Sequence, residues 1–163
     1  MIEIRNAVIR DWENLWEILE PVIRAGEVFA LPTDMPNEAA LEYWFAPGNW
    51  VFVAEENGAV VGSYYLRANQ RGGGSHVCNC GYVTAEWAGR RGVASRMCEH
   101  SLGFGSAVGF RAMQFNFVVS TNERAVQLWQ RHGFTEVGRL PRAFQHPVLG
   151  FVDALVMWRS LEE

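Results

Sequence analysis

The stretch His76–Gly105, which reads HVCNCGYVTAEWAGRRGVASRMCEHSLGFG, decides the fold. It begins as an apolar strand, turns through a segment of glycine and arginine, and continues as a helix. The first turn of a helix has unpaired backbone N–H groups, and the helix dipole favours an anion there. Because Gly92 has no Cβ, a phosphate can approach its backbone closely. The stretch therefore predicts a pyrophosphate site made by Gly89, Arg90, Arg91, Gly92, Val93 and Ala94.

The composition is that of one ordinary folded domain, residues 1–163. Hydrophobic residues make up 49% of the chain and charged residues 20%, which is enough apolar material for a core. The formal net charge of −4 argues against a protein that coats nucleic acid, so phosphate binding must be local. No apolar run reaches the roughly 18 residues of a membrane span, and residues 1–12 lack a signal peptide's apolar stretch. We expect a cytoplasmic protein with no membrane partner.

The three cysteines, Cys78, Cys80 and Cys98, do not predict a disulfide framework or a metal site. Their number is odd, and Cys78 and Cys80 are too close in sequence to join without strain. A zinc site needs a second pair of ligands, which the sequence lacks. We expect three small buried hydrophobic residues in a reducing compartment, and no metal.

Apolar residues at helical spacing predict several helices. The first covers residues 8–25, where Pro21 predicts a kink or a break and Gly26 a C-cap. Asn37 is expected to cap a second helix that runs to Phe45. A third follows Arg91, and a fourth begins after Asn122 and ends at Gly133.

Alternating and apolar runs predict the strands. Asn57-Gly58 is a strong hairpin signal between the two strands of residues 50–55 and 59–66. Residues 139–150, which contain Pro141 and Pro147, are expected to form a long loop. The remaining strands are expected at residues 2–5, 76–84, 112–119, 134–138 and 152–158. Strands alternating with helices indicate one α/β domain.

The loop at residues 27–36 carries the apolar side chains Phe29 and Leu31 between the first two helices. These two residues are candidate substrate-binding residues on a lid. The loop can equally be packed on its neighbours, without any role in binding.

Two motifs resemble those of the GCN5-related N-acetyltransferases (the GNAT family). Gly92 and Ala94 fit the end of the motif R/Q-x-x-G-x-G/A, although Gly89 stands where that family has Gln or Arg. The run from Asn122 to Phe134, NERAVQLWQRHGF, resembles N-x-x-A-x-x-L-Y-x-x-x-G-F. The resemblance implies an α/β GNAT fold whose mixed, mostly antiparallel central sheet is splayed between strands four and five and flanked by helices. It also implies an acetyl-CoA-dependent N-acetyltransferase.

The same resemblance implies which residues hold acetyl-CoA. The backbone of Tyr82, Val83 and Thr84 would pair with the pantetheine arm, and Asn122 belongs to the second motif. Trp129 replaces the family's usual Tyr, which protonates the departing thiolate. An indole N–H can donate a hydrogen bond but cannot usefully release its proton. Trp129 is therefore either a weak helper or simply a wall of the cofactor tunnel.

Two asparagines, Asn79 and Asn116, lie in strands among apolar neighbours, where a buried amide without partners is costly. Each can satisfy a loose backbone group at the splay, or face the acceptor. A narrower resemblance to azetidine-2-carboxylate N-acetyltransferases, carried by residues 74–82, Phe115-Asn116 and Pro32-Thr33-Asp34, supports the second interpretation. It implies that Asn79 orients the acceptor nitrogen and that Asn116 holds its carboxylate. It also implies a small amino or imino acid as acceptor, and detoxification as the role.

Other functions remain open from the sequence. The acceptor can instead be an aminoglycoside, a polyamine or a protein N-terminus, or the domain can bind acetyl-CoA without catalysis. The closing strands are expected to leave a free edge, which makes a homodimer possible.

Overall fold

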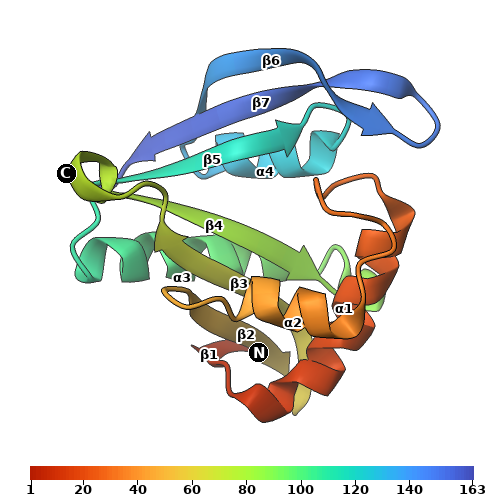
Figure 1. The fold of residues 1–163 in the computed structure, drawn as a ribbon. Helices are drawn as coiled ribbons and strands as arrows, with labels where there is room; N and C mark the ends of the chain where they lie inside the picture. The colour runs from red at the N-terminus through yellow and green to blue at the C-terminus, as the bar shows by residue number, and fades with distance from the viewer.

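The computed structural model describes residues 1–163, whose seven strands form one sheet in the order β1-β2-β3-β4-β5-β7-β6. The only parallel pair is β4 with β5; all other neighbours are antiparallel. In Figure 1 these two strands start together and then diverge. The strands are β1 Ile2–Asn6, β2 Trp50–Glu56, β3 Ala59–Ala68, β4 Val77–Thr84, β5 Ala112–Val119, β6 Thr135–His146 and β7 Gly150–Ser160. The predicted α/β fold with a sheet that opens between strands four and five is confirmed.

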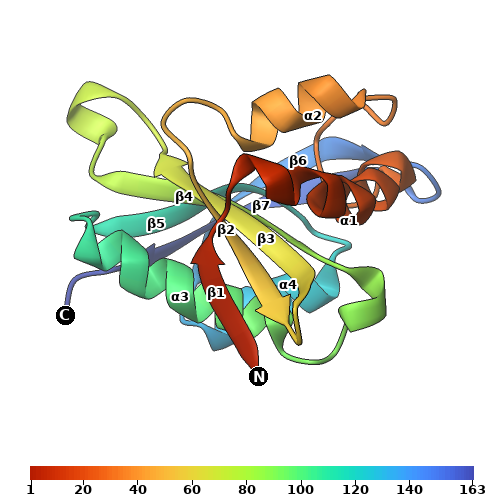
Figure 2. The ribbon, with the colours of Figure 1, turned by 90° about the horizontal axis from the view of Figure 1, so that it is seen from below.

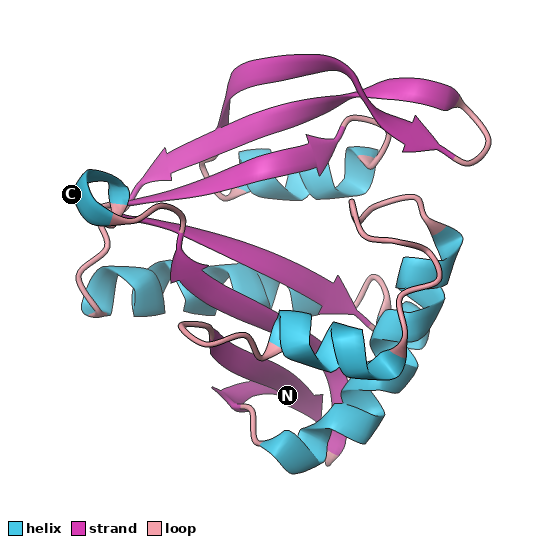
Figure 3. Cartoon of the chain, in the orientation of Figure 1, coloured by secondary structure: helices cyan, strands magenta, loops and turns pink.

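Four α-helices cover the two faces of the sheet (Figures 2 and 3). They are α1 Trp12–Ala25, α2 Asn37–Trp44, α3 Val93–Ala107 and α4 Glu123–Arg131. The first two lie on one face, where Trp44 of α2 meets Tyr65 of β3, and the other two lie on the opposite face. The opening between β4 and β5 is therefore flanked by helices from both layers.

The predicted end of helix α1 is correct, whereas the predicted start of α2 is not. Gly26 ends the helix in the left-handed conformation, at φ +66°, and donates its N–H to the Ile23 carbonyl, so the predicted C-cap is confirmed. Pro21 lies inside α1 without dividing it into two helices. The predicted cap at Asn37 is wrong, because the cap position is Pro36. The Asn37 side chain instead accepts a hydrogen bond from the Trp12 indole N–H at 2.8 Å, which links α2 to α1.

The hairpin between β2 and β3 forms where Asn57-Gly58 predicts it, with positive φ at both residues. The predicted loop over residues 139–150 is wrong, because β6 continues to His146. Its register against β7 shifts between Leu140 and Phe144, and this irregularity contains Pro141 and Arg142, the latter at φ +49°. Since β6 is the edge of the sheet, Pro141 removes no necessary ladder bond.

The core lies between the sheet and its helices, and it contains all three cysteines as buried free thiols, as predicted. Burial raises the pKa of Cys78 and of Cys98 to about 12, so both remain protonated at neutral pH. None of the helices is long and apolar enough to span a membrane.

Candidate active site

The site begins where β4 and β5 stop pairing. Their ladder contains only Val77 opposite Ala112 and Cys78 opposite Met113. On the side of β4 that faces β3, Val77 accepts a hydrogen bond from the N–H of Asn69, just after β3, and Ala85, just after β4, donates one to the Val61 carbonyl of β3. Because backbone groups alternate between the two sides of a strand, those of Cys80, Tyr82 and Thr84 face β5 instead. Beyond Cys78 the β5 backbone no longer meets them, so these groups border the opening unpaired.

A cavity of about 800 Å³ occupies this opening. It continues from the β4–β5 gap to the loop before α3 on one side and to the 27–36 loop on the other. The cavity brings together every predicted site residue except Arg91. These lining residues are Phe29, Leu31, Asn79, Tyr82, Val83, Thr84, Gly89, Arg90, Gly92, Val93, Ala94, Asn116, Asn122 and Trp129.

One end of the cavity is a loop suited to an anion. Gly92 precedes α3 at φ +82°, and Arg90 is also left-handed at φ +65°. The first backbone bond of α3 runs from the Arg96 N–H to the Gly92 carbonyl, and no side chain caps the helix. The N–H groups of residues 93–95 therefore have no partner in the protein and are available to a phosphate.

Arg91 points elsewhere. Its guanidinium donates to the Glu56 carboxylate at 3.0 Å and to the Trp87 carbonyl at 3.3 Å. The bond to Glu56 fastens the loop to the end of β2, and the bond to Trp87 lies within the loop itself. Arg90 is thus the arginine of this loop that lines the cavity.

The two predicted amides lie at the other end of the opening. The Asn79 amide nitrogen donates to the Gln114 carbonyl of β5 at 2.9 Å, so it satisfies a loose backbone group at the splay. The Asn79 carbonyl oxygen has no hydrogen bond. Every buried side-chain nitrogen and oxygen of the protein does have a partner, so this oxygen is not buried and is open to the cavity. Asn116 accepts from Gln114 at 3.0 Å and donates to Asn69 at 2.6 Å. Both amides are therefore held in fixed orientations.

Trp129 is part of an aromatic wall. Its ring lies 4.9 Å from that of Tyr82 and 4.8 Å from that of Phe115, and it is buried. The Tyr82 hydroxyl shares a hydrogen bond of 2.6 Å with Ser101 of α3, and burial raises the pKa of Tyr82. This phenol therefore points into the core and stays neutral. Asn122 caps α4, accepting from the Ala125 N–H at 3.4 Å.

The 27–36 loop is fastened at its carboxyl end, because Arg24 donates to the carbonyls of Thr33 at 2.7 Å and Met35 at 2.9 Å. Phe29 is half-buried and meets the Trp44 ring edge-on at 6.3 Å. Phe29 and Leu31 line the cavity at the same time as they pack on their neighbours.

The sequence prediction missed Tyr43, Tyr65 and Arg67, which also line the cavity. Tyr65 and Arg67 lie opposite Gly81 and Asn79 in the β3–β4 ladder. Alternation along residues 59–68 places them on one face of the sheet, but only the register of β3 against β4 places that face beside Asn79.

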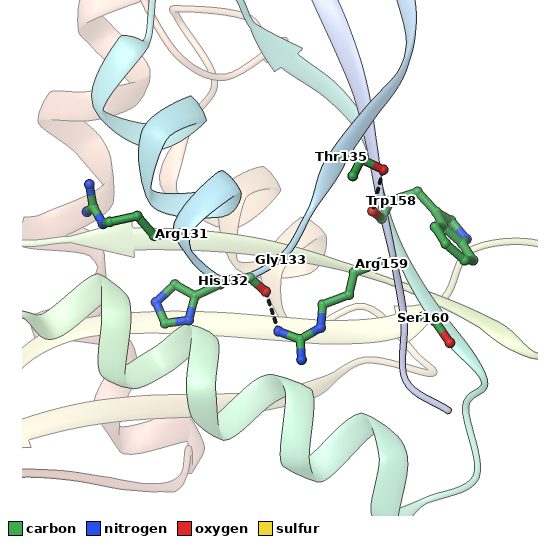
Figure 4. Close-up of a pocket in the computed structure, with 7 residues that line it drawn as sticks. All are labelled: Arg131, His132, Gly133, Thr135, Trp158, Arg159 and Ser160. Atoms are coloured by element: carbon green, nitrogen blue, oxygen red, sulfur yellow. Dashed lines mark hydrogen bonds between the residues drawn. The ribbon is translucent and has the colours of Figure 1, made fainter. Parts of the chain in front are cut away.

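A second hollow, of about 640 Å³, lies where α4 ends beside β7 (Figure 4). Arg159 donates there to the His132 carbonyl, and Thr135 donates to the Trp158 carbonyl at 3.4 Å. These contacts fasten the α4–β6 turn to β7. The hollow contains none of the predicted site residues, and Arg131 is the one residue that lines both it and the larger cavity.

Comparison with known proteins agrees with this geometry. The sequence model of the acetyltransferase (GNAT) family matches residues 9–134. The structure of a GCN5-related N-acetyltransferase from Kribbella flavida is 36% identical, with a TM-score of 0.93, and the match covers 98% of this chain and 97% of that one. A GNAT superfamily phosphinothricin acetyltransferase (Pat) from Sinorhizobium meliloti, solved in complex with AcCoA, shares the fold at 23% identity and a TM-score of 0.86, over 99% of this chain and 89% of that one.

Among curated proteins, N-acetyltransferase aca1 of Schizosaccharomyces pombe is 31% identical over 101 residues. The match covers 60% of this chain and 47% of that protein, so it spans about half of the relative's length. The family match extends from the start of the first helical segment to the end of the second motif, across the anion loop and the splayed strands. The chain belongs to the acetyltransferase (GNAT) family.

Proposed function

We propose that this protein transfers an acetyl group from acetyl-CoA to the amine of a small molecule. The observation that carries the proposal is the continuous cavity between β4 and β5, which has unpaired backbone N–H groups at one end and two fixed amides at the other. Family membership supports the reaction, and the neighbour solved with AcCoA supports the donor.

The residues present fit acetyl-CoA. A pyrophosphate has donors in the N–H groups of residues 93–95 and a cation in Arg90. The amide groups of a pantetheine arm have partners in the β5-facing backbone of Tyr82 and Thr84. The Val83 backbone faces β3, so Val83 would contribute its side chain to the cavity wall. Trp129 and Asn122 line the same passage.

Acetyl-CoA, when bound, supplies the thioester as acyl donor. In our proposal the backbone N–H of Tyr82, which faces the gap, polarises the thioester carbonyl. The open carbonyl oxygen of Asn79 accepts a hydrogen bond from an N–H of the acceptor amine and so directs the nitrogen lone pair at the thioester carbonyl. Asn116 holds the other end of the acceptor. A water held by Asn79 relays the proton that the amine loses to bulk solvent. As the new C–N bond forms, the C–S bond of the thioester would break and CoA would leave as its thiolate.

The proposed acceptor is a small amino or imino acid, as the resemblance to azetidine-2-carboxylate N-acetyltransferases implies. Phe29 and Leu31 would close over it. Glu86 is the only acidic residue that lines the cavity, against four arginines, and this charge balance disfavours polyamines and aminoglycosides. The free thiols agree with the cytoplasm, where we place a detoxifying role. We also propose that two copies of the chain can form a homodimer by pairing along the free edge of β6.

A panel of acceptors tests the function. Purified protein is mixed with acetyl-CoA and, separately, with amino acids, imino acids such as azetidine-2-carboxylate, polyamines and an aminoglycoside, and thiol release is followed. We expect release that depends on an added amino or imino acid. Thioester cleavage that no amine accelerates would contradict the proposal, and preference for polyamines would contradict the acceptor class.

A further inference from the structure

Arg67 of β3 is a half-buried cation without a partner. It lines the cavity, yet its guanidinium donates no hydrogen bond within the protein and lies within 4 Å of no carboxylate. It is held instead over two phenol rings, 5.1 Å from the centre of Tyr65 and 5.9 Å from that of Tyr43. Stacking of this kind positions a guanidinium while leaving its N–H groups free. The free N–H groups favour an anion brought from outside.

The platform beneath Arg67 is built into the sheet. The hydroxyls of Tyr43 and Tyr65 are 3.1 Å apart, and Trp44 meets Tyr65 edge-on at 4.9 Å, so the rings are fixed. Tyr65 lies opposite Gly81, where a Cβ would come within 2.5 Å of the phenol ring. Glycine at position 81 thus allows the ring to lie across β4. The platform orients Arg67 without neutralising it.

The register of the sheet places Arg67 at the acceptor end. It pairs directly with Asn79, whose open oxygen is proposed to hold the acceptor nitrogen. Thr84 lies five residues further along β4, which is about 16 Å towards the anion loop. The other arginines of the cavity, Arg90, Arg124 and Arg131, belong to that loop and to α4. Arg67 is therefore the cation beside the reacting groups, and the single lining carboxylate, Glu86, lies just after β4 near the anion loop.

We propose that Arg67 acts together with Asn116 to bind the carboxylate of the acceptor, and that it thereby selects amines that carry a carboxylate over those that carry a neutral carboxamide. This inference rests on the proposed function and names the group that recognises the substrate. A planar guanidinium can donate two parallel hydrogen bonds to a carboxylate, whereas a carboxamide offers one acceptor and no charge. Recognition at Arg67 fixes one end of the acceptor, and Asn79 fixes the nitrogen at the other.

The test compares acceptors in pairs, each an amino or imino acid and its carboxamide, such as L-azetidine-2-carboxylate and L-proline with their amides. For wild type we expect a higher kcat/KM on the acid. In Arg67→Gln the KM for the acid should rise about 10- to 100-fold, the loss expected for a charge-assisted pair, while the KM for the amide changes little. Arg67→Lys should restore part of the preference. Arg71→Gln, an exposed arginine outside the cavity with the same charge change, should preserve it.

Calorimetry separates this inference from the proposed function. Titration of L-azetidine-2-carboxylate into the protein with CoA present should give binding that Arg67→Gln weakens, while acetyl-CoA titration should be the same for both proteins. Equal losses on acid and amide, or equal carboxylate binding by wild type and variant, would overturn the role of Arg67 even if acetyl transfer occurs. Absence of any carboxylate binding would also overturn it. Failure to bind acetyl-CoA would refute the proposed function instead.

Discussion

Asn79 is the residue on which the proposed chemistry depends, because its nitrogen is committed to Gln114 and its oxygen is open. Asn79→Ala should lower kcat by about 100-fold or more, since it removes the group that orients the amine. The dissociation constant of acetyl-CoA should stay within a few-fold of wild type. Steady-state kinetics and calorimetry measure the two quantities.

Asn79→Ala should also lower the stability of the protein, because it removes the hydrogen bond to Gln114, and a measurement of unfolding isolates this effect. Asn79→Ala leaves the Gln114 carbonyl without its donor, so a loss of unfolding free energy of about 1–3 kcal/mol is expected. If acetyl-CoA affinity falls along with kcat, Asn79 acts only as a fastener of the splayed strands.

Trp129 tests whether this site uses a side-chain acid. A general acid contributes about 10²- to 10⁴-fold, and Trp129 is instead packed against Tyr82 and Phe115 as a wall. Trp129→Phe should therefore lower kcat less than about 10-fold and leave its pH profile unchanged. A larger loss of kcat in a protein that still binds acetyl-CoA would assign the indole N–H a part in thiolate departure.

The loop before α3 is the element whose conformation matters most for donor binding. Gly92 is at φ +82° with open space around it, so Gly92→Ala adds backbone strain of about 1–2 kcal/mol without a clash. Part of this strain should be relieved by a shift of the loop, which raises the dissociation constant of acetyl-CoA. The matched control is Gly72→Ala, also at positive φ with open space but outside the cavity. Equal acetyl-CoA affinity in both variants would contradict the role of the loop.

The junction of β1 and α1 predicts a pH dependence of stability. Hydrogen bonds from Arg5 and from the Val8 N–H hold the pKa of Asp11 below its usual range. A lowered folded-state pKa stabilises the fold above the unfolded-state value of about 4, and this stabilisation is lost as the pH falls through the folded-state pKa. Asp11→Asn should therefore reduce the unfolding free energy at pH 7 and flatten its decline below about pH 4. Urea titrations of both proteins across pH 2–7 measure this, and parallel curves would contradict it.

Elements whose conformation depends on neighbouring residues can be predicted from the sequence. Elements whose form depends on their position in the sheet, or on contacts with distant segments, cannot. Asn57-Gly58 predicts its hairpin because a two-residue turn needs positive φ at both positions. Pro141 was expected to mark a loop, but an edge strand with a register shift tolerates it. Asn37 was expected to cap its own helix, whereas its carbonyl oxygen accepts from Trp12, 25 residues earlier. Neither the edge position nor the helix–helix contact is encoded nearby in the chain.

The Arg67 platform depends on contacts between segments that are far apart in the sequence, and it could not be predicted from the sequence. The anion loop follows from local residues, and the opening between the fourth and fifth strands was expected from the family resemblance. The place of Arg67 beside Asn79 requires the register of β3 against β4, and the platform requires Gly81 to admit the Tyr65 ring. Such pairings between distant segments are invisible to patterns along one segment.

The most direct test is a crystal structure of the protein with acetyl-CoA. We expect the pyrophosphate on the N–H groups of residues 93–95 beside Arg90, the pantetheine arm along the β5-facing backbone of Tyr82 and Thr84, and the thioester next to Asn79. A donor bound at the hollow beside β7, or a complex in which the gap between β4 and β5 stays empty, would contradict it.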